Sequence, residues 1–139
     1  MKGRKRHLLV DTQGLVWNVV ISAANMGDRD LAQWLLQSGQ SHLPRLNVIW
    51  ADAGYRGERF LDEFQRDTGV RLEVVKRLPD QPHFPVGGKR WVVERTFAWL
   101  GNARRLAKDY ELHFKSSAAM IYTAMIRLLL RRLALSPPP

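Results

Sequence analysis

The sequence predicts an α/β fold in which short strands alternate with helices and two further helices follow. In residues 1–75, runs of β-branched and aromatic residues alternate with segments whose apolar residues recur every three or four positions. Residues 89–135 show helical periodicity only. Strands alternating with helices are typical of α/β architecture. The chain has 139 residues, 45% of them hydrophobic, which is enough for one core. We therefore expect one domain over residues 1–136 and a proline tail at 137–139.

The first predicted element is a β-hairpin. His7–Val10 and Leu15–Ile21 are apolar runs of strand length. They are joined by Asp11–Gly14, which is rich in residues that favour turns. Because aspartate is favoured in turns for its local hydrogen bonds, we expect Asp11 to be structural, and we expect the same of Asp28.

A helix, a strand, a second helix and a second strand are predicted to follow the hairpin. The first helix is expected to be capped by Asn25 or Asp28 and to end at Gly39. The later elements are expected at Leu46–Ala51 (strand), Glu58–Thr68 (helix) and Val70–Val75 (strand).

Two helices are predicted in the C-terminal part of the chain. Residues 78–88 contain too many prolines and glycines for anything but a loop. One helix is expected from Lys89 to about Tyr110, and another, capped by Ser116 or Ser117, is expected to end near Leu135. We assign to the core the apolar residues of this last helix: Met120, Ile121, Met125, Ile126, Leu128, Leu129 and Leu130.

Charge and composition narrow the classes of function. Lys and Arg number 22 against 13 Asp and Glu, which gives a net charge of +9 and makes a polyanion such as nucleic acid the first partner to consider. The absence of cysteine excludes disulfides, thiolate zinc sites and cysteine nucleophiles, and it fits a cytosolic protein. The N-terminus lacks an apolar signal segment, and Thr123 and Arg127 interrupt the most apolar stretch, so no membrane partner is expected.

Asp52 is the first candidate for chemistry. It follows the predicted strand Leu46–Ala51 and precedes Gly54 and Gly57. Ligands of α/β proteins bind at the carboxyl ends of strands, so its carboxylate is a candidate for a ligand site. Aspartate at the same position also caps turns and helices, and the residues alone leave both interpretations open.

Glu94 is the second candidate. At 100° per residue it lies at the border of the apolar stripe formed by Val93, Phe97 and Leu100. Its own helical face also carries Arg90, Ala98, Gly101 and Arg105. Small residues leave room for a bulky partner, and arginines suit phosphate. A surface pair between Arg90 and Glu94, worth about 0.2–0.5 kcal/mol, explains the same spacing, so a surface pair and a metal or phosphate site both remain open.

Three segments carry a resemblance to a known family. They are Lys2–His7 with Val10–Thr12, then Trp50–Gly57, then Arg90–Leu100. In this order they closely resemble the DDE domain of bacterial insertion-sequence transposases, and the likeness covers nearly the whole chain.

The resemblance implies a ribonuclease-H-like mixed sheet flanked by helices, with one catalytic Asp on the first strand, another on the fourth, and a Glu on a late helix. On this chain Asp52 matches the second Asp and Glu94 matches the Glu. The implied cofactor is Mg²⁺, with Mn²⁺ as a substitute: two ions held by the three carboxylates activate a water and then a DNA 3′-hydroxyl for attack on phosphodiesters. Hard oxygen ligands suit Mg²⁺, and paired ions stabilise the entering and leaving oxygens.

The chain departs from the family pattern at two places. It opens where the family approaches its second strand, so we expect the first strand and its Asp to be missing and the domain to be incomplete at its N-terminus. A strand edge left open in this way invites pairing with another chain, and we expect an upstream transposase fragment or a homo-oligomer as a partner. The tyrosine and lysine that some members place near the Glu fall at Gly87 and Gly101.

The expected function is DNA transposition by metal-dependent strand cleavage and transfer, in the bacterial cytoplasm at the nucleoid. The expected partner is double-stranded DNA, as element terminal repeats and as target. The residues expected to contact it are Lys2, Arg4, Lys5, Arg6, Arg56, Arg90, Arg104 and Arg105. The alternative is a non-catalytic basic DNA-binding remnant, or a regulator of an intact transposase.

Overall fold

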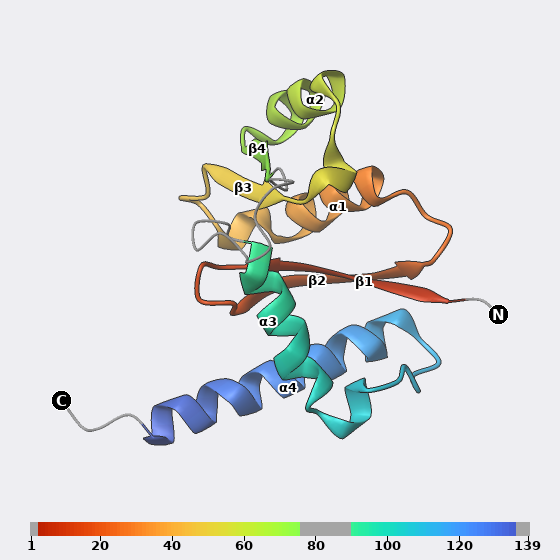
Figure 1. The fold of residues 1–139 in the computed structure, drawn as a ribbon, viewed down its shortest axis with the longest axis vertical. Helices are drawn as coiled ribbons and strands as arrows, with labels where there is room; N and C mark the ends of the chain where they lie inside the picture. Colours follow the sequence, from red (N-terminus) through yellow and green to blue (C-terminus); the bar gives the residue numbers. More distant parts are fainter. Residues whose placement is uncertain (1–2, 76–89, 136–139) are drawn as a thin grey trace, which may run out of the picture.

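The α/β fold class is confirmed by the computed structural model, which describes residues 3–75 and 90–135, with only the backbone described at Ala53 and Arg90. The helices and strands, shown in Figure 1, are β1 (Arg4–Val10), β2 (Val16–Ala23), α1 (Asp28–Gly39), β3 (Val48–Ala51), α2 (Glu58–Thr68), β4 (Arg71–Val74), α3 (Arg90–Gly101) and α4 (Phe114–Leu135). Short 3₁₀ helices lie at Gln40–His42 (η1), Ala53–Tyr55 (η2) and Arg104–Leu106 (η3).

The described strands form two small sheets, where the sequence predicted one mixed sheet lacking its first strand. β1 pairs with β2 in antiparallel fashion, from Arg4 opposite Ala23 to Val10 opposite Val16, with an irregularity after Leu9. β3 pairs with β4 in parallel, from Val48 opposite Arg71 to Ala51 opposite Val74. In the part of the chain that the structure describes, β1 and β3 do not pair with each other, and each has one edge without a strand beside it.

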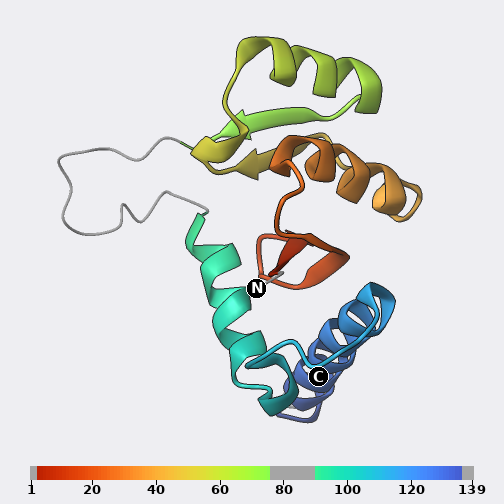
Figure 2. The same ribbon diagram turned by 90° about the vertical axis from the view of Figure 1, so that its right-hand side faces the viewer.

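The β1–β2 hairpin lies between two helices, with α1 on one side and α4 on the other (Figures 1 and 2). Successive side chains of a strand point to opposite faces, and β2 uses both. Val20 packs with Leu31 and Leu35 of α1, whereas Val19 and Ile21 belong to the cluster that contains Ile121 and Met125 of α4. Burial on both faces explains why residues 19–21 of this strand are all apolar rather than alternating with polar residues.

A second core joins α1, α2 and the parallel strands. Leu36, Phe64, Val70 and Leu72 are its buried members. Helix α2 ends as predicted, because Gly69 takes the left-handed conformation with φ +71° and its N–H donates to the Gln65 carbonyl. The chain then turns directly into β4.

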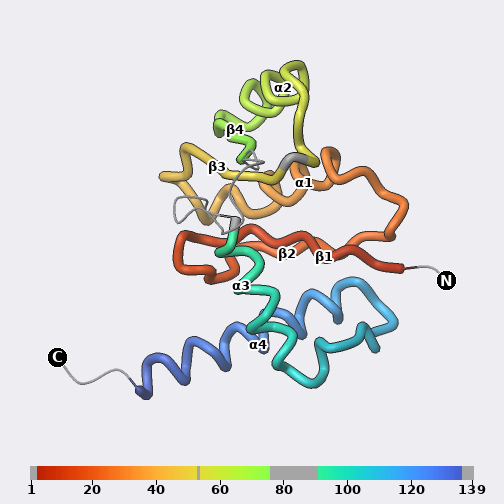
Figure 3. The backbone as a smooth tube through the Cα atoms, viewed as in Figure 1, coloured from red at the N-terminus to blue at the C-terminus, as the bar shows by residue number. Residues whose placement is uncertain are grey.

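The helix ends differ from the sequence predictions at three places. Helix α1 is preceded by Gly27, and neither Asn25 nor Asp28 caps it through a side chain. The predicted helix to Tyr110 stops at Gly101, a residue with low helix propensity. Helix α4 begins at Phe114, so both Ser116 and Ser117 lie inside it. Figure 3 shows α3 running beside the hairpin before the chain turns into α4.

Part of the assignment of α4 to the core was also wrong. Ile121 and Met125 are buried, but Ile126 and Leu130 are 56% and 61% exposed.

In the described residues, no helix combines the length and the apolar character needed to cross a membrane.

Candidate active site

Asp52 lies where β3 ends and caps the short helix η2. Its Oδ1 accepts a hydrogen bond from the Gly54 N–H at 2.9 Å. The capping role left open by the sequence is therefore present. The side chain is nevertheless exposed, so capping holds one carboxylate oxygen in place without burying the group.

Glu94 lies on α3 and shares a cavity with Asp52. The two exposed carboxylates come from elements far apart in the sequence, and both line a cavity of about 520 Å³. Its walls come from β1, β3, β4, α1, α2 and α3, and they include Leu9, Leu36 and Phe97. The cavity therefore combines an apolar floor with acidic groups.

Three polar residues of this cavity were missed as site residues by the sequence reasoning. Asp28 was expected to be structural, and it does pair with Lys5 at 2.9 Å, but both side chains also line the cavity. His7 and Tyr55 line it as well. For His7, the sequence offered a signal, because Lys5, His7 and Leu9 alternate along β1 and so share one face of the strand. For Asp28 and Tyr55 the positions depend on how α1 and η2 pack.

The cavity changes the ionisation of two of these groups. Burial raises the pKa of Tyr55, and the negative charges of Asp28 and Asp52 raise it further. Burial lowers the pKa of His7, an effect that Asp28 opposes and Lys5 reinforces. Both shifts favour the uncharged form of the side chain at neutral pH.

The donors that face this cavity fit a divalent cation. Mg²⁺ is commonly held by one or two carboxylates, with waters and substrate phosphates completing its shell, and Asp52 with Glu94 supplies two carboxylates. Within the described residues, no group of three or more His, Asp or Glu side chains could hold a metal ion. Asp28 also lines the cavity, but the described residues do not bring it together with Asp52 and Glu94 into a three-ligand group.

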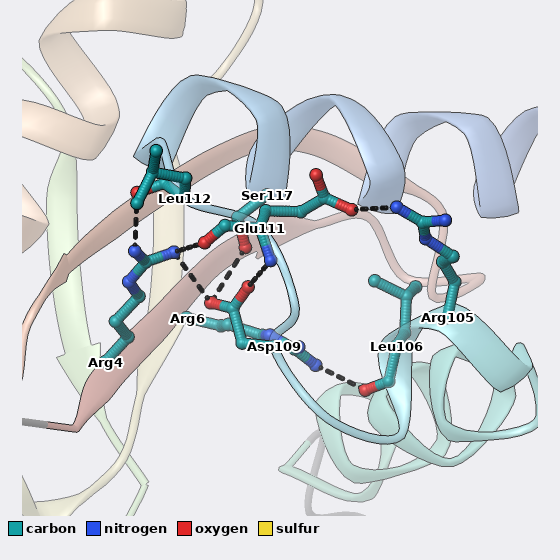
Figure 4. Close-up of polar contacts among 8 residues, drawn as sticks. All are labelled: Arg4, Arg6, Arg105, Leu106, Asp109, Glu111, Leu112 and Ser117. Atoms are coloured by element: carbon teal, nitrogen blue, oxygen red, sulfur yellow. Dashed lines mark hydrogen bonds and ion pairs between the residues drawn. The ribbon is translucent and has the colours of Figure 1, made fainter. Parts of the chain in front are cut away.

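Two of the basic residues expected to contact DNA are used inside the fold. Arg4 donates to the carbonyls of Glu111 and Leu112 at 2.6 and 2.8 Å and pairs with Asp109 at 3.3 Å (Figure 4). Arg6 donates to the Leu106 carbonyl at 2.9 Å. Both guanidinium groups tie β1 to the segment between α3 and α4, which was not predicted.

The other basic residues lie in several places. Lys5 lines the cavity that contains Asp52 and Glu94, and Arg56 is exposed in the loop before α2. Arg104 and Arg105 line a different cavity, of about 630 Å³, between η3 and α4; Arg105 also pairs with Glu111 at 2.8 Å. Lys2 and the side chain of Arg90 lie outside the described residues.

Asp11 closes the β1–β2 turn, as expected of a structural residue. Its Oδ1 accepts from the N–H groups of Gln13 and Leu15 at 2.8 and 3.0 Å. Replacing a side chain that caps backbone N–H groups costs about 1 kcal/mol. We expect Asp11→Ala to lower the free energy of unfolding by about that amount in urea denaturation, and the exposed Thr12→Ala to change it by a few tenths at most. A loss of Mn²⁺ binding in Asp11→Ala as large as that in Asp52→Ala would contradict a purely structural role.

The comparisons with known proteins agree with the resemblance seen in the sequence. The family model described as transposase DDE domain matches residues 1–129. A protein of Burkholderia cepacia named as a transposase for insertion sequence element IS402 is 34% identical over 118 residues, which cover 78% of this chain and 54% of the relative. The chain thus spans about half the length of that relative. No solved structure matches the chain significantly. The residues matched by the family model make up most of the sequence, and the chain therefore belongs to the transposase DDE domain family.

Proposed function

We propose that this chain is the part of an insertion-sequence transposase that carries two of three metal-binding carboxylates, Asp52 and Glu94. The observation that carries the proposal is that these two residues, each matched to a family position by its surrounding motif, line one cavity. The proposed reaction is cleavage of DNA at the element ends and joining of the freed 3′-hydroxyl to target DNA. Mg²⁺, for which Mn²⁺ can substitute, is the proposed cofactor.

The roles of the two carboxylates follow from where they lie. Asp52 is held by the Gly54 N–H at the end of β3, so this ligand of the proposed cation site is positioned by a strand. Glu94 approaches from α3 across the cavity. A divalent cation bound between them would stabilise the charge on the entering and leaving oxygens of a phosphodiester. The neutral form of Tyr55, favoured by burial, avoids adding a further negative charge beside Asp52.

We place the third carboxylate on a strand that lies outside this chain, between β1 and β3. Both strands have an unpaired edge in the described residues, and Lys5–Leu9 of β1 and Ile49–Asp52 of β3 line the same cavity. An inserted strand would find hydrogen-bonding partners on both sides. The share of the B. cepacia protein that this chain does not span leaves room for such a segment in a full transposase.

We propose double-stranded DNA as the partner, contacted by Lys2, Lys5, Arg56, Arg90, Arg104 and Arg105. Phosphate contacts by Lys and Arg supply most of the affinity of such interfaces. Arg4 and Arg6 are left out because their guanidinium groups are engaged by carbonyl oxygens of the fold.

The test is cleavage of a labelled element-end duplex in Mg²⁺ or Mn²⁺. The chain alone is compared with the chain extended upstream or mixed with the upstream fragment. We expect cleavage only when the upstream part is supplied, and loss of cleavage in Asp52→Ala and Glu94→Ala. Glu63→Ala, which removes an exposed carboxylate from α2, is the matched control and should retain cleavage. Robust cleavage by the chain alone, abolished by Asp52→Ala, would contradict the proposal that the third carboxylate lies outside this chain.

The second candidate is a DNA-binding remnant or a regulator that competes with an intact transposase for its ends. It is favoured by the net charge of +9 and by the lack of a three-ligand group in the described residues. DNA binding without cleavage in either format would support it. Binding that weakens steeply with salt is expected under both functions, so cleavage alone separates them.

A further inference from the structure

The face of α3 that lies away from Glu94 is fastened to the β1–β2 turn. Thr96 is 0% exposed, and its Oγ1 lies 2.7 Å from the Gly14 carbonyl oxygen and 3.0 Å from that of Val92. The first contact joins two elements that are far apart in sequence. Gly14 itself is buried, so this hydrogen bond is shielded from water.

A stack of arginine and tryptophan side chains adds to this attachment. Arg95 donates to the Gln13 carbonyl at 2.8 Å, and its guanidinium carbon lies 4.3 Å from the ring centre of Trp91 and 4.7 Å from that of Trp99. Arg132 of α4 lies 4.6 Å from the Trp99 ring centre. Cation–π contacts of this kind are worth about 0.5–2 kcal/mol each, depending on exposure. The turn, α3 and α4 are thus held to one another.

We infer that the β1–β2 turn sets the rotation of α3 and thereby the position of the Glu94 carboxylate opposite Asp52. Thr96 follows Glu94 by two residues, which places it about 200° further round the helix. The far side is fastened to Gly14 through Thr96, and the neighbouring Arg95 is fastened to Gln13, which leaves Glu94 facing the cavity. Thr96, Arg95 and Gly14 are positioning residues, and this inference rests on the proposed function.

The geometry of cation binding makes such an attachment useful. Mg²⁺ accepts ligands within a narrow range of distances near 2.1 Å, and functional sites lose activity when they are about 1 Å too loose. A side chain about 6 Å from the axis of a helix moves by about 1 Å when the helix turns by about 10°. A small rotation of α3 would therefore be enough to move the Glu94 carboxylate away from a cation held by Asp52.

The chain offers a direct readout because it contains no cysteine. Asp52→Cys and Glu94→Cys, introduced together and spin-labelled, report the distance between the two positions without any metal. We expect one narrow distance distribution in this background, and a broadened or shifted one when Thr96→Val is added. Thr123→Val is the matched control, since Thr123 makes the same bond to a carbonyl one helical turn earlier, Ala119, at 2.9 Å but is exposed. It should leave the distribution unchanged.

A second arm measures Mn²⁺ affinity in the chain with Asp52 and Glu94 intact. Loss of a residue that orients metal ligands weakens binding about tenfold or more, so we expect that loss for Thr96→Val, recovery in Thr96→Ser, which keeps the hydroxyl, and no change for Thr123→Val. Circular dichroism identifies any variant that fails to fold. If Thr96→Val fails to fold, the variant Arg95→Lys is used in its place, and Arg59→Lys, at an exposed arginine, is its control.

The outcomes separate the two proposals. An unchanged distance distribution in a folded Thr96→Val or Arg95→Lys variant would overturn the positioning role, whatever the metal data show. Failure of the wild-type chain to bind Mn²⁺ would instead count against the proposed metal site, and the spin-label distances would still decide the role of the turn.

Discussion

Substitution of Gly14 by alanine is expected to lower the free energy of unfolding by about 3 kcal/mol. Gly14 has φ +83°, a conformation that costs an L-residue about 1–2 kcal/mol. A Cβ there would also lie 2.8 Å from the Thr96 Oγ1 and 3.0 Å from the Trp99 ring, and overpacking of a buried site adds about 1–3 kcal/mol. Urea denaturation followed by circular dichroism measures the sum.

Gly69 provides the matched control for this substitution. It has a similar φ of +71°, but a Cβ built on it meets nothing within 4 Å. Gly69→Ala should therefore cost only the conformational part, about 1 kcal/mol. Equal losses in the two variants would show that the contact between the turn and α3 is looser than the structure indicates.

Removing the Asp109 carboxylate is expected to cost about 2 kcal/mol. This group joins three parts of the fold, since it accepts from the Glu111 N–H at 3.2 Å and the Ser117 hydroxyl at 3.1 Å and pairs with Arg4 at 3.3 Å (Figure 4). Hydrogen bonds to a charged group are worth about 1.5–3 kcal/mol, and those with partial exposure fall at the lower end. Thermal or urea unfolding of Asp109→Ala at neutral pH tests this value.

The same residue predicts how stability depends on pH. Burial alone would raise the pKa of Asp109, but its hydrogen bonds from Glu111 and Ser117 and the charge of Arg4 outweigh burial, so the pKa lies below the ordinary value of 3.8. The unfolded chain then takes up this proton first, and the contribution of Asp109 is present above about pH 3.8 and lost as the pH falls through the lowered pKa. The difference in the free energy of unfolding between wild type and Asp109→Ala should therefore become smaller as the pH falls below about 3.8.

Glu63→Ala is the control for Asp109→Ala. Glu63 pairs with Arg59 one turn away on the surface of α2, with side chains 47% and 92% exposed, and such pairs contribute about 0.5 kcal/mol or less. A loss in Asp109→Ala no larger than in Glu63→Ala would mean that the attachment of Arg4 to the α3–α4 segment does not need the carboxylate.

The elements predicted well from the sequence are those whose signals are local. Helix α2 ends where Gly69 supplies a left-handed residue, and β2 was predicted from its apolar run. The beginning of α4 was missed because Ser117, a good capping residue in sequence, uses its hydroxyl on Asp109 instead. Too many residues of α4 were assigned to the core, since only tertiary packing decides that Ile121 is buried and Leu130 is not.

The candidate site could be predicted only where a motif carried it. Asp52 was proposed from its place at the end of a strand and from the family motif, and Glu94 from the motif around it. Their common cavity depends on how α3 lies against the hairpin, which no local pattern reports. For the same reason Asp28 and Tyr55 were not assigned to the site. Arg4 and Arg6 were expected to contact DNA, but their hydrogen-bond partners lie within the fold, 107 and 100 positions away in the sequence.

The edges of β1 and β3 that no described strand covers also bear on how the isolated chain behaves in solution at high concentration. An open strand edge is a template for a strand of another molecule, and what opposes such encounters here is the mutual repulsion of chains that each carry a net charge of +9. That repulsion reaches about 10 Å in 0.1 M salt but only about 3 Å in 1 M salt. Concentrated salt, which releases bound nucleic acid from a basic protein, is therefore also the condition expected to promote its self-association.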